Sequence, residues 1–150
     1  MCDCDYIYLD GRNCVLDADN YLNWELNPNY FRNKNQNHKK VSVSLQTVQF
    51  IGNYVLDPEL FYPNSCDIVT NLNFKNYYST SGIKSLGIIE TYLDDAINTL
   101  KSEQHSSLPR IKYETDIPSQ IQIGILFMNT LVNVETVSQH FRLLLKFDYE

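Results

Sequence analysis

The clearest alternation of hydrophobic and polar positions lies at the end of the chain. Between residues 139 and 148, apolar side chains recur at every second position, and these are Phe141, Leu143, Leu145 and Phe147. Successive side chains of a strand point to opposite faces, so this segment is expected to bury one face and expose the other. Residues 120–127 repeat the pattern with isoleucines at positions 121, 123 and 125. Two such segments predict an antiparallel sheet with one packed face.

Shorter segments of the same kind predict six further strands, at residues 6–9, 21–26, 41–50, 66–74, 86–92 and 110–114. Within the third of these, the apolar residues shift from odd to even positions after Leu45. Such a change of phase predicts a β-bulge near Gln46 and Thr47. Residues 94–101 are expected to form a short helix with Ile97 and Leu100 facing inward.

These elements predict an all-β fold, a single eight-stranded antiparallel jelly-roll sandwich with long loops and at most one or two short helices. An immunoglobulin-like sandwich is the alternative. A chain of 150 residues suits one domain, spanning residues 1–150. Composition supports the strands, because the chain has 11 tyrosines and 7 phenylalanines but only two alanines.

Charge and hydropathy narrow the range of partners. The net charge is −6, which counts against wrapping nucleic acid. One basic stretch contains Arg32, Lys34, His38, Lys39 and Lys40. A solvated loop explains this stretch, and a small electrostatic contact surface is the alternative. No apolar run reaches 18 residues, so no membrane span is expected, and the N-terminus does not resemble a secretory signal.

The cysteines do not show the paired spacing of a zinc site. Cys2, Cys4, Cys14 and Cys66 are expected to be reduced thiols, with a metal or disulfide cluster of the first three as the alternative. The segment from Asp17 to Asn20 lacks the glycine and glutamate of an EF-hand, so its acids are expected to cap a turn. We therefore expect no metal and no cofactor.

Nucleophilic catalysis needs a Ser or Cys beside a His and a carboxylate, and no known elbow sequence occurs. His105 lies among serines in an expected polar loop, and His140 is expected on the wet face of the last strand. Paired carboxylates occur, but their spacing does not place any two across a groove. These patterns contain no catalytic signature, so the residues alone indicate a fold class and not an activity.

Three aromatic doublets are the candidate partner contacts. They are Tyr30–Phe31, Phe61–Tyr62 and Tyr77–Tyr78. Adjacent residues of a strand face opposite ways, so one ring of each doublet is expected to reach solvent and the other to close an end of the sandwich. Tyrosine is common at protein interfaces because it combines a large area with a hydroxyl group. Trp24 lies on the apolar side of its strand and is expected in the core.

Three segments of the chain form a recognisable set, and they are Tyr8-Leu9-Asp10-Gly11-Arg12-Asn13, Leu22-Asn23-Trp24-Glu25-Leu26-Asn27 and residues 41–48. Together they resemble the opening of jelly-roll minor capsid proteins of large double-stranded DNA viruses. The two final strands fit the closing pattern of these proteins. Gly11 stands where their "D-S-R-N" segment has serine.

The resemblance implies a virion structural protein without catalysis, located in the virion after assembly in the host cytoplasm or nucleus. Its partners would be the major capsid protein and copies of itself, in a homo- or hetero-oligomer. A glycan- or receptor-binding β-sandwich module is the alternative function.

Overall fold

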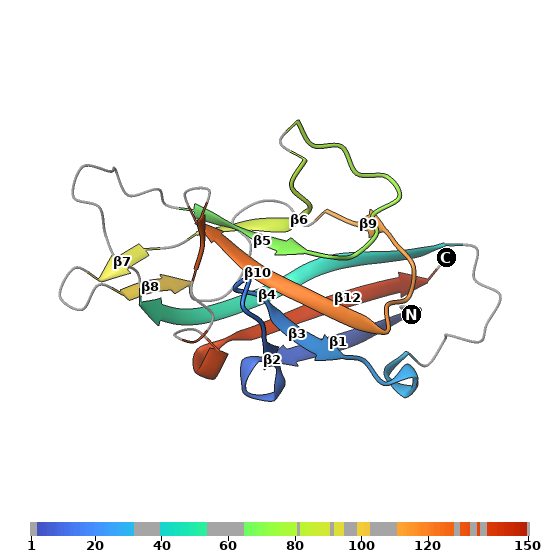
Figure 1. The fold of residues 1–150 in the computed structure, drawn as a ribbon. Helices are drawn as coiled ribbons and strands as arrows, with labels where there is room; N and C mark the ends of the chain where they lie inside the picture. The colour runs from blue at the N-terminus through green and yellow to red at the C-terminus, as the bar shows by residue number, and fades with distance from the viewer. Residues whose placement is uncertain are drawn as a thin grey trace.

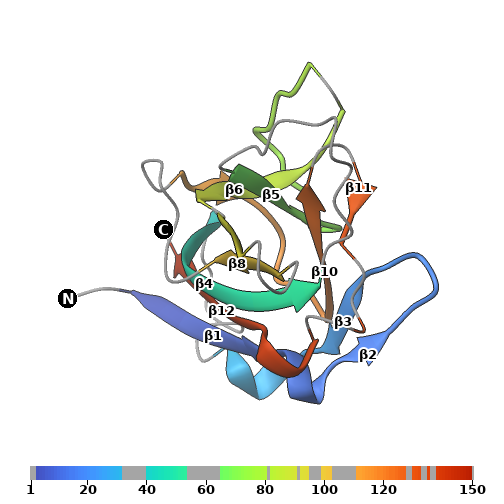
Figure 2. The ribbon, with the colours of Figure 1, turned by 90° about the vertical axis from the view of Figure 1, so that its left-hand side faces the viewer.

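The protein folds into two antiparallel sheets that share one core (Figures 1 and 2). The computed structural model describes residues 3–31, 40–53, 65–80, 82–90, 92–94, 99–102, 111–127, 130–132, 135 and 138–149. Within these residues the structure is mostly β-strand, which confirms the expected all-β class.

The first sheet has the order β1-β12-β4-β8-β7, with β9 paired to β4. Its strands are β1 (Cys4–Asp10), β4 (Val41–Asn53), β7 (Tyr92–Asp94), β8 (Thr99–Ser102), β9 (Tyr113–Glu114) and β12 (Arg142–Tyr149). Strand β1 therefore forms one edge of this sheet, as Figure 2 shows.

The second sheet has the order β2-β3-β10-β5-β6, with β11 paired to β10. Its strands are β2 (Val15–Leu16), β3 (Leu22–Glu25), β5 (Ser65–Thr70), β6 (Ser85–Glu90), β10 (Gln120–Phe127) and β11 (Thr130–Leu131). Three 3₁₀ turns are also present, η1 (Gly11–Asn13), η2 (Pro28–Tyr30) and η3 (Ser138–His140).

The core is built from the alternate positions that the sequence pattern predicts. On and just before β12, the four apolar positions from Phe141 to Phe147 are fully buried, and so are the three isoleucines of β10. Burial of each such side chain contributes about 1.5–3 kcal/mol. Trp24 is also in this core, as expected.

The β-bulge in β4 is confirmed by its register with β12. Leu144 lies opposite Thr47, whereas Leu145 lies opposite Leu45, so Gln46 is the extra residue. Because one residue is added, the apolar side chains on both sides of Gln46 point into the same core.

The predicted helix over residues 94–101 is wrong. Asp94 ends β7, and residues 99–102 form β8, which pairs with β7 and with residues 50–53 of β4. Hydrogen bonds to a strand far away in the sequence outweigh the local helical pattern, and Ile97 lies outside the described residues. The described residues contain twelve strands against the expected eight, and the additional ones, β2, β7, β8 and β11, have two to four residues each.

Candidate functional site

The described cysteines differ in their chemical state. Cys14 and Cys66 are free, and burial raises the pKa of each thiol. Cys14 donates to the carbonyl oxygen of Gly11 at 3.0 Å. Cys4 is disulfide-bonded, which differs from the expected reduced state. In the described part of the chain, no three His, Cys, Asp or Glu side chains are placed to hold a metal ion.

Asp17 caps a turn, as the sequence predicts for the acids of this loop. Its Oδ1 accepts from the main-chain N–H groups of Asp19 (2.9 Å) and Tyr21 (3.1 Å). Its Oδ2 accepts from the side-chain amides of Asn23 (3.0 Å) and Gln122 (3.2 Å). These hydrogen bonds, that from Asn23 above all, lower the pKa of Asp17. The carboxylate therefore fixes the entry to β3 and ties it to β10.

Several predicted residues lie outside the described part of the chain. They include His105 with Ser106 and Ser107, the doublet Phe61–Tyr62 and residues 32–39 of the basic stretch. Ser102, expected in the same loop as His105, is described and ends β8. His140 is exposed, as expected, but it lies in η3 and not on the last strand, which begins at Arg142.

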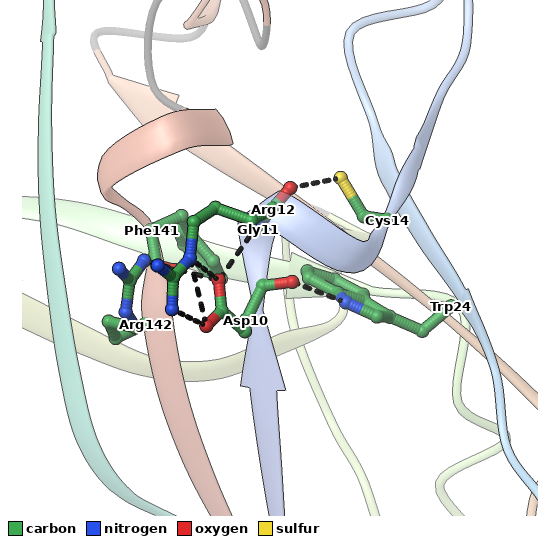
Figure 3. Close-up of polar contacts among 7 residues, drawn as sticks. All are labelled: Asp10, Gly11, Arg12, Cys14, Trp24, Phe141 and Arg142. Atoms are coloured by element: carbon green, nitrogen blue, oxygen red, sulfur yellow. Dashed lines mark hydrogen bonds and ion pairs between the residues drawn. The ribbon is translucent and has the colours of Figure 1, made fainter.

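A polar corner joins the two sheets where β1 ends (Figure 3). The Asp10 carboxylate accepts from Arg12, at 2.9 Å from its main-chain N and 2.8 Å from its Nη2. Arg142 forms a second ion pair with this carboxylate, with its Nη1 at 3.3 Å from Oδ1. The hydrogen bonds from Arg12 lower the pKa of Asp10 to about 2. The Asp10 carbonyl accepts from Trp24 Nε1 at 2.9 Å, so the indole links β3 to β1.

Gly11 lets two 3₁₀ turns pack against each other at this corner. Its N–H donates to the Phe141 carbonyl at 2.9 Å. A Cβ at position 11 would lie 2.0 Å from the Ser138 carbonyl oxygen and 2.9 Å from the Phe141 Cβ. The serine that the resembling pattern carries here would therefore collide with η3. In this chain glycine is the residue that fits.

Two of the three aromatic doublets are described, and in each one ring reaches solvent. Tyr30 is 53% exposed, whereas Phe31 is 3% exposed and packs edge-on against Phe147. Tyr78 is 98% exposed, and Tyr77 is partly buried. Of these four candidate contacts, Tyr30 and Tyr78 offer surface to a partner, and Phe31 belongs to the core.

Tyr77 is held from several sides. Its hydroxyl donates to the Ile83 carbonyl and accepts from the Ser85 N–H at 3.1 Å. Its ring lies 5.3 Å from the centroids of both Phe74 and Tyr113. These contacts close an end of the core rather than leaving the ring free for a partner.

Two exposed tyrosines on β1 were not singled out from the sequence. Tyr6 and Tyr8 are 57% and 58% exposed, whereas Ile7 and Leu9 between and after them are buried. Both tyrosines therefore lie on the outer face of the first sheet, and Lys146 Nζ lies 6.0 Å from the Tyr6 ring centroid. The alternation of tyrosine with apolar residues in β1 is the feature of the sequence that could have identified them.

A groove of about 330 Å³ separates β1 from β3 and η2. Its walls are residues 6–10 on one side, residues 24–26 and Tyr30 on the other, and Asn13 at one end. Tyr6, Tyr8 and Tyr30, which are all exposed, are among its lining residues. We call it the tyrosine groove. Its aromatic rings and polar rim are features of protein-binding surfaces.

Comparison of the chain with known protein families, characterised proteins and solved structures finds no match. Within the described residues, no helix has the length and apolar content that crossing a membrane requires.

Proposed function

We propose that this chain is a non-catalytic structural protein of a virion. It has a jelly-roll fold and acts by packing sideways against copies of itself and other capsid proteins. The observation that carries this proposal is the order of the strands. In a jelly roll, eight strands pair as a nested hairpin, first with eighth and second with seventh, and successive pairs alternate between two sheets.

Among the described residues, eight strands have four or more residues, and the way they pair supports this scheme. The nested antiparallel pairs are β1 with β12, β3 with β10, β4 with β8 and β5 with β6. The first and third pairs belong to one sheet, and the second and fourth to the other. This arrangement supports the jelly-roll part of the family resemblance.

The position of the exposed rings supports a packing role. Tyr6 and Tyr8 lie on the edge strand β1, and Tyr30 in η2 lines the same groove. Tyr78 is exposed in the segment between β5 and β6. A rigid sandwich with exposed aromatic side chains at its edge suits contacts between neighbouring subunits. Such contacts need more than about 1,000 Å² of buried surface.

The test is co-assembly with a capsid. The purified chain is mixed with jelly-roll major capsid protein, and the mixture is analysed by sedimentation and electron microscopy. We expect the chain to sediment with assembled particles and to occupy repeated positions in them. A chain that stays in the supernatant at every ratio of the two proteins would contradict the proposal.

A second groove favours the alternative function, glycan binding. This groove of about 460 Å³ is lined by amide side chains that suit sugar hydroxyls, those of Asn13, Asn23, Asn71 and Gln120. Trp24 also borders it, but its ring is mostly buried and its Nε1 is bonded to Asp10, so it does not offer an open stacking face. Binding on a glycan array, abolished by Asn71→Ala, would favour this alternative.

A further inference from the structure

The hydrogen bonds of β1 leave a defined set of main-chain groups on its outer edge. In an antiparallel pair, hydrogen-bonded residues occur at every second position. The Gly11 N–H donates to the Phe141 carbonyl, and these two residues continue the register that pairs β1 with β12. Counting back by twos from Gly11, residues 9, 7 and 5 also direct their N–H and C=O groups toward β12. The main-chain groups of Tyr6 and Tyr8 consequently point away from the sheet.

These groups open into the tyrosine groove. The carbonyl of Asp10, which belongs to the same outward set, accepts from Trp24 across the groove and closes one end of it. Strand β1 pairs with β12 alone among the described strands, and its other side forms the edge of the sheet. An edge with unpaired groups is a template for another strand.

We propose that this edge pairs with the same edge of a second copy of the chain, so that two molecules form one continuous sheet. The two-fold axis passes beside Ile7, and Tyr6 lies opposite the partner subunit's Tyr8. This inference rests on the proposed function and deepens it, because it names one partner and the surface that it uses.

The free groups are arranged for such a symmetric contact. Tyr6 and Tyr8 lie on either side of Ile7, so a two-fold rotation places the N–H and C=O groups of each against those of the other in the second copy. The rings of the paired tyrosines then meet on the outer face, where aromatic cross-strand pairs are stabilising.

The charges of β1 allow this register although the chain carries a net charge of −6. Asp10 would lie opposite the partner's Cys4, and Asp5 opposite the partner's Leu9. No acidic residue of the strand therefore faces another acidic residue directly, which would be destabilising. Asp10 is in addition neutralised by Arg12 and Arg142 within its own molecule.

Amide hydrogen exchange on the wild-type chain tests the contact without any substitution. We expect exchange at Tyr6 and Tyr8 to slow by about tenfold or more as the concentration rises from micromolar to millimolar. The amides of Ile7 and Leu9 serve as internal controls, because they are bonded to β12 in both states. Self-association with unchanged exchange at Tyr6 and Tyr8 would overturn the proposal.

The variant Tyr8→Pro removes an N–H that is not used within the molecule. Proline is tolerated on the solvent side of an edge strand, so the fold should persist in circular dichroism. Light scattering should then report a monomer at concentrations at which the wild type is a dimer. Tyr78→Ala, which changes an exposed ring elsewhere, is the matched control and should remain dimeric. If Tyr8→Pro fails to fold, Tyr8→Lys places a charge on the edge instead.

The results separate this pairing from the proposed function. A Tyr8→Pro or Tyr8→Lys variant that folds and remains dimeric would overturn the pairing. So would a wild-type chain that is monomeric at every concentration. Either outcome, combined with sedimentation of the chain with capsids, would leave the virion role in place and assign it to another surface.

Discussion

Replacing Gly11 with alanine tests how the corner between β1 and β12 is packed. The added Cβ would lie 2.0 Å from the Ser138 carbonyl oxygen, whereas Cβ atoms in proteins essentially never approach another atom closer than 3.0 Å. The obstructing atom belongs to the main chain, so η3 has to move by about an ångström as a unit. This shift would strain the hydrogen bond between Gly11 and Phe141.

The loss in the free energy of unfolding of Gly11→Ala follows from the collision and from the strained hydrogen bond. Overpacking a tight site costs typically 1–3 kcal/mol, and weakening one hydrogen bond adds about 1 kcal/mol. We expect Gly11→Ala to lower the free energy of unfolding by about 3 kcal/mol, which lowers the Tm by about 6–12 °C in a domain of this size. Urea unfolding followed by the fluorescence of Trp24, the single tryptophan, reports directly on this corner.

Gly82→Ala is the matched control. Gly82 has a φ of +75° and nothing within 4 Å of the added Cβ, so this change introduces conformational strain without a collision. Its expected cost is about 1–2 kcal/mol. If Gly11→Ala unfolded within about 0.5 kcal/mol of wild type, or cost less than Gly82→Ala, the close packing of η1 on η3 would be refuted.

Two further predictions concern the same strands. Leu145→Asp should give no soluble folded protein, because it loses core burial and adds an unpaired charge at a fully buried position. Arg142→Asp should stay folded and lose about 1 kcal/mol in urea unfolding, since it removes a partly exposed ion pair with Asp10. The depressed pKa of Asp10 stabilises the fold above about pH 4, and this contribution is lost as the pH falls toward about 2. Over that range wild type should lose more stability than Asp10→Asn, and equal losses would contradict the assigned role of Asp10.

The buried faces of the long strands could be predicted from the sequence because they follow a period of two. The alternation before and along β12, the isoleucines of β10 and the bulge at Gln46 depend on local order alone, and all three are confirmed. A change of phase within a strand is visible in the sequence, because the residue that shifts the phase is also the residue that bulges.

Strands β7 and β8 could not be predicted in this way. Residues 99–102 pair with residues 50–53, about fifty positions earlier, and the local pattern contains no sign of that partner. In the candidate site, the doublets predicted that one ring of each pair is exposed, and the structure shows that these are Tyr30 and Tyr78. The position of Tyr6 and Tyr8 at the edge of a sheet could not be predicted, because it depends on how β1 pairs with distant strands.

The close packing at Gly11 was likewise hidden in the sequence. In the sequence, Gly11 was notable only because the resembling capsid proteins have a serine at the same place. The contact that makes glycine necessary comes from Ser138, at the other end of the chain. A long-range contact of this kind becomes visible only when the two segments are placed in space.

The nested order of the strands is tested most directly by nuclear Overhauser contacts between Hα protons. In an antiparallel pair these protons come closest at residues that do not exchange hydrogen bonds. The structure predicts strong Hα–Hα contacts between Tyr6 and Lys146 and between Tyr8 and Leu144, joining the first strand to the last. A first strand whose Hα contacts lead instead to β3 would contradict the nested order, and with it the proposed jelly-roll fold.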